Sequence, residues 1–454
     1  MNRIPHPIDV QSFIDAERFA PLQWLVLLFG FLIVSADGYD TAAIGFIAPS
    51  LVQEWGVARG ELGVVMSAAL AGLGLGAILA GPVADRFGRK CVLVASVAAF
   101  GICTLIAAQA QSIASLTALR FITGLGLGAA MPTTITMMSE YAPQRLRALS
   151  VNAMYCGFSC GLMAGGAASA WLIPHFGWRS VLIAGGVGPL ALALVLLVFQ
   201  PESAQFLALR PGNERRIARI LRRVAPARDV TGRTFVARTA PLETQEKARG
   251  KSALALLLAH DYRRRTLLLW LTMFMSLLVY YFITNWMPTL LRKAGFSVEH
   301  GALMASVFPL GGLIGNLVAG RLMDRFGANR TIVVDYLLSA LLVALMGASV
   351  EHPMLLGVLL FLCGSLVTSA ATSMSTYASM IYPTEARTTG VAWMQGIGRV
   401  GGMAGSFVGA ALLGLGWNFN TIFAVLALPA LASAGTLMLM KPQRVYAPVN
   451  ALEP

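Results

Sequence analysis

The sequence has few charged residues and few histidines for its length. Only 12% of its 454 residues are Asp, Glu, Lys or Arg, about half the fraction usual in soluble proteins, whereas 57% are hydrophobic. Its five cysteines lie inside apolar stretches, at spacings that fit no metal site. Its five histidines all lie outside those stretches. This composition excludes an ordinary soluble protein, a cysteine–histidine metal site and a histidine relay within the apolar stretches.

Apolar runs of about 20 residues recur along the chain, and a helix of that length crosses a hydrocarbon layer of about 30 Å. We count twelve, at residues 22–51, 62–83, 91–110, 113–138, 148–173, 179–199, 266–290, 301–322, 331–350, 354–380, 389–414 and 418–440. Backbone polar groups must be hydrogen-bonded internally in lipid, so these runs predict an all-α protein of twelve transmembrane helices. The first twenty residues are polar and do not resemble a cleaved signal peptide.

The net charge of +13 is distributed unevenly. With the N-terminus inside, 28 of the 34 Lys and Arg residues fall on the cytoplasmic side. This bias is the positive-inside rule, and it predicts cytoplasmic termini in a bacterial inner membrane. It also argues against nucleic acid as the partner of the basic residues.

The polar, arginine-rich segment 200–265 divides the chain into halves at 1–199 and 266–454. We expect this segment to be a cytoplasmic loop, attracted to anionic headgroups and too polar to fold. The halves repeat at an offset of 239 or 240 residues: "GPVADRFGRK" (81–90) returns as "GRLMDRFGANR" (320–330), and Gly56 pairs with Gly295. The sequence therefore predicts two six-helix halves related by pseudo-symmetry.

Several motifs resemble those of one transporter superfamily. The repeated "DRFG" loops, "RFITGLGLGAAMP" (120–132) and "PESAQFL" (201–207) are similar to signatures of the major facilitator superfamily. Within it, "DGYD" (37–40), "NWMPTLL" (285–291) and "GVAWMQGIGRVGG" (390–402) resemble the aromatic acid:proton symporter family. The chain resembles the 4-hydroxybenzoate/protocatechuate permeases of that family. The resemblance implies a transporter of aromatic carboxylates and not an enzyme.

Four charged residues lie deep in the predicted spans, where each charge costs about 3 kcal/mol or more: Asp37, Asp40, Arg120 and Arg399. Asp37 and Asp40 are three residues apart and project from one helix face. Two carboxylates this close in a low dielectric do not both ionise readily, so one is pushed toward protonation. Arg120 falls at nearly the depth of Asp40. We predict that these three residues couple transport to protons; the alternative is a static pair that joins two spans. In the family, the "DGxD" aspartates are essential for transport.

Arg399 lies near the middle of the eleventh span among glycines, and the second half has no deep acid to neutralise it. An arginine facing a cavity suits a carboxylate ligand, because its guanidinium can form two parallel hydrogen bonds. The alternative is a pair with Asp335, which we expect to reach the membrane interface, or with backbone carbonyls. Further residues are candidates to hold the aromatic ring and the hydroxyl group of the substrate, although packing could explain each of them as well. They are Asn285, Trp286, Tyr281, Trp393 and Tyr155.

A second group of charges lies at the cytoplasmic ends of the spans, and we expect it to gate transport. Its aspartates are placed to cap helix N-termini of the opposite half. Ordinary solvated loop charges are the alternative. The group comprises Asp85, Arg89, Glu140, Arg147, Asp324 and Arg387.

These observations predict a monomeric permease that imports an aromatic carboxylate of the hydroxybenzoate class by symport with protons. Alternating access would carry the substrate across the bilayer, with protons as the coupling ion and no cofactor. Two other functions compete with this one. A proton-coupled efflux antiporter could use the same aspartates, but it has no obvious need for Arg399. A receptor for aromatic acids would require an output domain, and none is recognisable.

Overall fold

The computed structural model describes residues 7–226, 228, 230, 232–236, 257–258, 260–382 and 387–440. In that part of the chain, twelve helices are long and apolar enough to cross a membrane, which confirms the predicted number of spans. The first six are α2 (Pro21–Trp55), α3 (Arg59–Phe87), α4 (Arg89–Ala107), α5 (Ile113–Tyr141), α6 (Arg147–Phe176) and α7 (Arg179–Phe199). The second six are α12 (His260–Lys293), α13 (Val298–Phe326), α14 (Ala328–Gly347), α15 (Pro353–Ile381), α16 (Arg387–Gly414) and α17 (Phe419–Met438).

Glycines at matching positions shape the turns of the two halves. Gly56 and Gly295, which follow α2 and α12, have φ angles of 62° and 97°. Gly177 and Gly416, before α7 and α17, have φ angles of 76° and 77°. Side chains with a Cβ rarely adopt these angles. Both pairs are 239 residues apart, so the repeat seen in the sequence is also a repeat of backbone conformation.

The same repeat governs how the helices pack within each half. Gly161 of α6 lies against the carbonyl of Ser35 in α2, and Gly401 of α16 lies against the carbonyl of Phe274 in α12. A Cβ at either glycine would overlap the facing backbone. The close approaches of α3 to α5 and of α13 to α15 match as well, with Gly72 on Phe121 and Gly311 on Phe361. Close helix approach through glycine is common in membrane bundles, and here it builds both halves alike.

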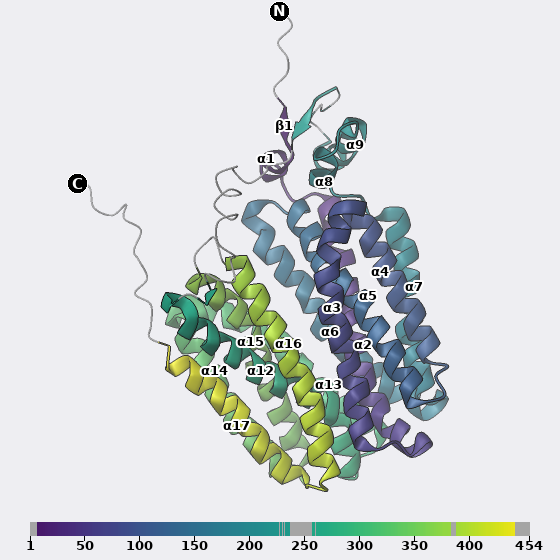
Figure 1. The fold of residues 1–454 in the computed structure, drawn as a ribbon, viewed down its shortest axis with the longest axis vertical. Helices are drawn as coiled ribbons and strands as arrows, with labels where there is room; N and C mark the ends of the chain where they lie inside the picture. Colours follow the sequence, from purple (N-terminus) through teal and green to yellow (C-terminus); the bar gives the residue numbers. More distant parts are fainter. Residues whose placement is uncertain are drawn as a thin grey trace, which may run out of the picture.

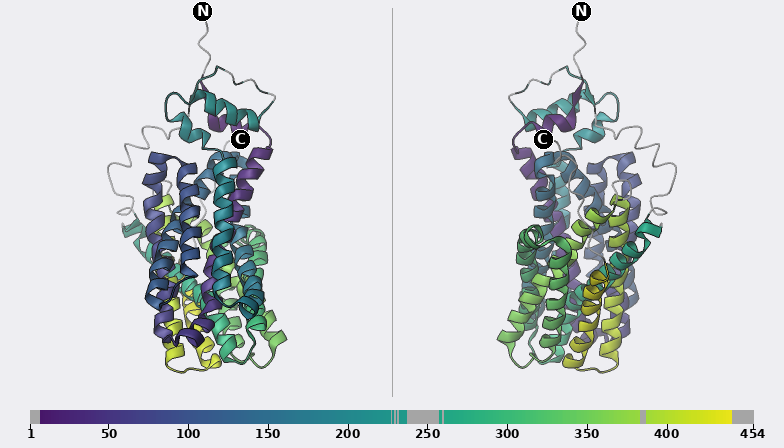
Figure 2. Two further views of the ribbon diagram at one scale, coloured as in Figure 1. Left: turned by 90° about the vertical axis from the view of Figure 1, so that its right-hand side faces the viewer. Right: turned by 90° about the vertical axis from the view of Figure 1, so that its left-hand side faces the viewer.

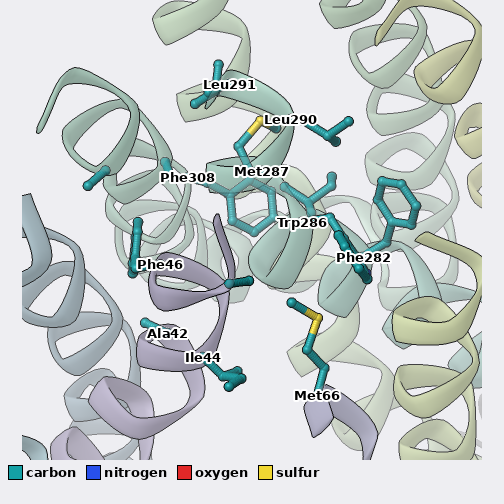
Figure 3. Close-up of a cluster of buried hydrophobic side chains, with 14 of the residues drawn as sticks. Ala42, Ile44, Phe46, Met66, Phe282, Trp286, Met287, Leu290, Leu291 and Phe308 are labelled. Carbon is teal, nitrogen blue, oxygen red and sulfur yellow. The ribbon is translucent and has the colours of Figure 1, made fainter. Parts of the chain in front are cut away.

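The two halves lie side by side, α2–α7 in purple to teal and α12–α17 in green to yellow (Figure 1). We call the end of the bundle that carries α8 (Ala204–Ala208) and α9 (Glu214–Val224) the cap side, and the opposite end the turn side. The halves meet toward the turn side, where Ser67 Oγ donates to the Met403 carbonyl at 3.3 Å. An apolar cluster joins them there, with Ala42, Ile44, Phe46 and Met66 facing Trp286, Met287 and Phe308 (Figure 3). Toward the cap side the helices of the two halves diverge in Figure 1.

A small folded unit, which we call the cap, stands at one end of the bundle in both views of Figure 2. It contains β1 (Ile8–Asp9), α1 (Val10–Asp15), α8 (Ala204–Ala208), α9 (Glu214–Val224) and β2 (Phe235–Val236), and β1 pairs with β2 in parallel. Its core packs on the end of α5, next to the 3₁₀ turn Gln144–Leu146. The buried side chains include Val10, Phe13, Ile14, Phe206, Leu207, Ile217, Leu221, Phe235, Met137 and Met138.

The expectation that segment 200–265 is too polar to fold is therefore wrong for residues 200–226. The apolar residues of α9 recur at helical spacing, Ile217, Ile220, Leu221 and Val224, and all four are buried. Its arginines occupy the exposed remainder of the helix. Because arginine is so frequent there, composition alone hides this amphipathic pattern. The C-terminal half also begins earlier than expected, since α12 begins at His260 and not near residue 266.

Candidate functional site

A buried ion pair joins α2 to α5 in the N-terminal half. Arg120 Nη1 donates to Asp40 Oδ1 at 2.5 Å, and Arg120 Nη2 donates to the Asp40 carbonyl at 3.3 Å. Both residues are 2% exposed. A guanidinium that bonds both the side chain and the main chain of its partner holds that partner in one position. The two residues thus lie at one depth, as their positions in the sequence predicted.

Asp37 lies one turn earlier on α2, in a different setting. It is 4% exposed, and its Oδ1 has no hydrogen-bond partner among the described residues. It lines a cavity between the two halves. Asp40, Arg120 and Thr41 line the same cavity, with Leu73 of α3 and with Tyr281 and Asn285 of α12. The cavity therefore brings the predicted proton-coupling residues together with two of the predicted substrate-binding residues.

Arg399 approaches this cavity from α16. Its Nη1 donates to the carbonyl of Leu73 at 3.3 Å, and Leu73 is one of the lining residues. Across the boundary between the halves, Arg399 interacts electrostatically with Asp37. The expected alternative partner, Asp335, instead accepts a hydrogen bond from Ser369 Oγ at 3.0 Å and is 5% exposed. The expectation that Asp335 reaches the membrane interface is wrong, because neighbouring helices bury it.

The aromatic and amide candidates separate into two groups. Tyr281 and Asn285 line the cavity, and Tyr155 of α6 interacts electrostatically with Asp37 and Arg399. Trp286 is fully buried in the apolar cluster, and its indole N–H donates to the Ser406 carbonyl at 3.0 Å. Trp393 stacks on Trp270 with ring centroids 5.8 Å apart. Neither tryptophan lines the cavity, so their geometry favours the packing alternative.

Part of the predicted gating group forms a cluster on the cap side. Arg89 Nε lies 3.6 Å from Glu140 Oε1, so α4 and α5 are paired there. Arg147 begins α6, and its Nε has no hydrogen-bond partner among the described residues. The side chains of Asp85, Asp324 and Arg387 lie outside the described residues, so their predicted roles stay predictions.

The sequence analysis missed Glu202, which contributes to the same cluster. Its Oε1 accepts hydrogen bonds from the backbone N–H groups of Arg89 at 3.0 Å and Lys90 at 3.1 Å, at the N-terminus of α4. Its carbonyl accepts a hydrogen bond from the Tyr141 hydroxyl at 2.7 Å. A carboxylate at a helix N-terminus is favourable because the helix dipole is positive there. The sequence signal for Glu202 was the "PESAQFL" motif (201–207), which resembles a superfamily signature but did not by itself indicate what the glutamate does.

Comparison with known proteins identifies the family. The sequence profile of the Major Facilitator Superfamily matches residues 30–303 and 269–453. The chain belongs to this superfamily. It is 46% identical over 432 residues to the 4-hydroxybenzoate transporter PcaK of Pseudomonas aeruginosa, covering 95% of each protein. It is 45% identical to the gallate transporter of Pseudomonas putida, covering 94% of each. These relatives are transporters of aromatic acids and not enzymes.

Solved structures show the same fold. The xylose transporter XylE from E. coli, in an inward open conformation, aligns with a TM-score of 0.73 at 18% identity, covering 92% of this chain and 96% of that one. At this identity the likeness concerns the fold alone.

Proposed function

We propose that this protein imports an aromatic carboxylate of the hydroxybenzoate class across the bacterial inner membrane by symport with protons. The observation that carries the proposal is the cavity between the halves, which two carboxylates and an arginine of the first half line, and beside which Arg399 of the second half bonds the Leu73 carbonyl. A carboxylate substrate needs a cation, and a proton-coupled carrier needs a buried group that can take up a proton. The names of the relatives support the substrate class.

The arrangement fits alternating access, in which the halves rock around a central site. The halves meet toward the turn side and their helices diverge toward the cap side (Figure 1), and from this we infer a carrier that opens toward its cap. With both termini in the cytoplasm, that state would release substrate to the inside. Arg89, Glu140 and Glu202, on the cap side, would then help to form the gate that closes in the opposite state.

The energetics favour symport with at least one proton. Moving one negative charge inward against 100 mV costs about 2.3 kcal/mol, and a proton that travels with the anion removes this cost. The substrate ring would lie against Tyr281, with Asn285 near its hydroxyl group.

Uptake into vesicles tests the proposal. The purified protein is reconstituted into proteoliposomes, and labelled 4-hydroxybenzoate uptake is measured under an inward proton gradient, with and without a protonophore. We expect accumulation that the protonophore abolishes, and none in empty vesicles. Equal uptake with the protonophore would refute proton coupling. Expulsion of preloaded substrate against its gradient, driven by protons entering the vesicle, would favour the efflux antiporter. Labelled gallate and benzoate would then rank the ring hydroxyls as determinants.

A further inference from the structure

The two aspartates of the "DGYD" motif have different partners, which suggests that they do different work. Asp40 is held by Arg120 through both its side chain and its carbonyl. Asp37 faces the cavity with one carboxylate oxygen that makes no hydrogen bond among the described residues. Burying a charged oxygen without a partner is costly, so Asp37 gains more than Asp40 from becoming neutral.

The groups around Asp37 come from four other helices. They are Arg120 of α5, Tyr155 of α6, Tyr280 and Tyr281 of α12 and Arg399 of α16, besides Asp40 on α2 itself. Of the two cations, Arg120 is committed to Asp40. Arg399 makes one longer hydrogen bond, to the Leu73 carbonyl. It is therefore the cation available to respond to a change at Asp37.

We propose that Asp37 is the proton-carrying group and that its carboxylate competes with the substrate carboxylate for Arg399, whereas Asp40 is the permanent partner of Arg120. This inference rests on the proposed function. When Asp37 takes up a proton, Arg399 is released from its attraction and can bind the substrate carboxylate. When the substrate leaves and the proton follows, Arg399 is attracted to Asp37 again. A single arginine shared between two carboxylates couples proton and substrate without a separate relay.

The charges of the cluster balance in both states of this cycle. Without substrate, two ionised aspartates face two arginines, so the net charge is zero. With one proton on Asp37 and one anionic substrate bound, the net charge is again zero. A carrier must rock its halves with this cluster in a low dielectric, where a net charge is expensive. The competition therefore favours movement of the carrier when it is empty or when it holds both the proton and the substrate. Movement with only one of the two bound is disfavoured.

Equilibrium binding across a range of pH tests the competition. Binding of 4-hydroxybenzoate to the full-length protein is measured by calorimetry between about pH 6 and pH 8, where the ligand remains an anion. In the wild type, we expect Kd to rise with pH by up to about tenfold per unit, because ionised Asp37 occupies Arg399. Proton uptake on binding, followed with a pH indicator in weak buffer, should approach about one proton per substrate at the high end.

Variants locate the responsible group. In Asp37→Asn, we expect the pH dependence and the proton uptake to vanish while affinity stays near the wild-type value at low pH. Asp37→Ser, which introduces the residue type of the repeat-equivalent Ser276, repeats this test if the first variant does not fold. Asp335→Asn, which removes a buried acid outside the cavity, should keep the wild-type profile.

The results separate this inference from the proposed function. Wild-type vesicles that do not accumulate 4-hydroxybenzoate under a proton gradient would refute the function itself. Wild-type vesicles that accumulate it, together with an Asp37 variant that keeps the pH slope and proton uptake, would refute only the competition. A wild type that binds the substrate without proton uptake at any pH would also refute it.

Discussion

The two halves of this protein are alike in packing and unlike in charge. Gly161 on Ser35 in the first half and Gly401 on Phe274 in the second make the same close contact. At the positions that repeat Asp37, Asp40 and Arg120, however, the second half has Ser276, Val279 and Leu360. Arg399, in turn, corresponds to Ser159. The fold thus needs the glycines in both halves but none of these charges twice, so the charges are free to serve transport.

The largest expected effect comes from breaking the ion pair that only the first half has. Arg120→Leu, which introduces the residue of the second half, leaves Asp40 charged and unpaired, and we expect a loss of about 3–5 kcal/mol in stability. Adding Asp40→Val to it should restore most of that stability, because an apolar pair of similar size avoids the desolvation cost.

Thermal unfolding in detergent and vesicle uptake separate the two roles of the pair. We expect the double variant to fold, to reach the membrane and to fail in proton-driven accumulation. If the double variant transports like the wild type, the Arg120–Asp40 pair only joins α2 to α5 and has no role in transport. Asp37→Asn alone should also abolish accumulation while leaving folded protein in the membrane.

The halves and their spans were predictable from the sequence because the signals are physical and long. Apolar runs near 20 residues and glycines that recur at an offset of 239 residues require no knowledge of distant contacts. The position of Asp37 against Arg399 was not predictable, because it depends on how the halves meet. Asp335 was misjudged for a different reason: counting residues gave its depth along α14 but not the neighbours that bury it. The cap was missed because its core draws on two distant segments.

The next effect tests Arg399, the charge that only the second half has. A point ammonium cannot reproduce a two-pronged contact with a carboxylate, so Arg399→Lys should bind substrate poorly. Loss of a buried charged pair typically costs about 2–5 kcal/mol, which is about 30-fold to several thousand-fold in Kd. Replacing the ligand carboxylate by a carboxamide should cost the wild type heavily but cost Arg399→Ala little more. If the two losses instead add in a calorimetric cycle, Arg399 does not touch the substrate.

A smaller effect tests the likeness of the halves. Gly161→Ala and Gly401→Ala each force a methyl group onto a facing carbonyl, and overpacking of this kind typically costs about 1–3 kcal/mol. We expect the two variants to lose similar stability in thermal unfolding. Gly435→Ala, where no neighbouring atom lies within 4 Å of the added carbon, is the matched control and should be near neutral. A large loss in only one half would contradict equivalent packing.

The smallest effect concerns the cap, whose core packs on the first half. The Tyr141 hydroxyl donates to the Glu202 carbonyl at 2.7 Å, and the Tyr141 carbonyl accepts from Gln23 Nε2 at 2.7 Å. Tyr141→Phe removes the first bond and keeps the second, so we expect a loss of about 1 kcal/mol in stability. Because Glu202 also binds the start of α4, a loosened Glu202 should slow turnover more than it weakens substrate binding. Vesicle uptake rates and calorimetric Kd values check this. A changed Kd at an unchanged uptake rate would show that the cap does not act on the gate.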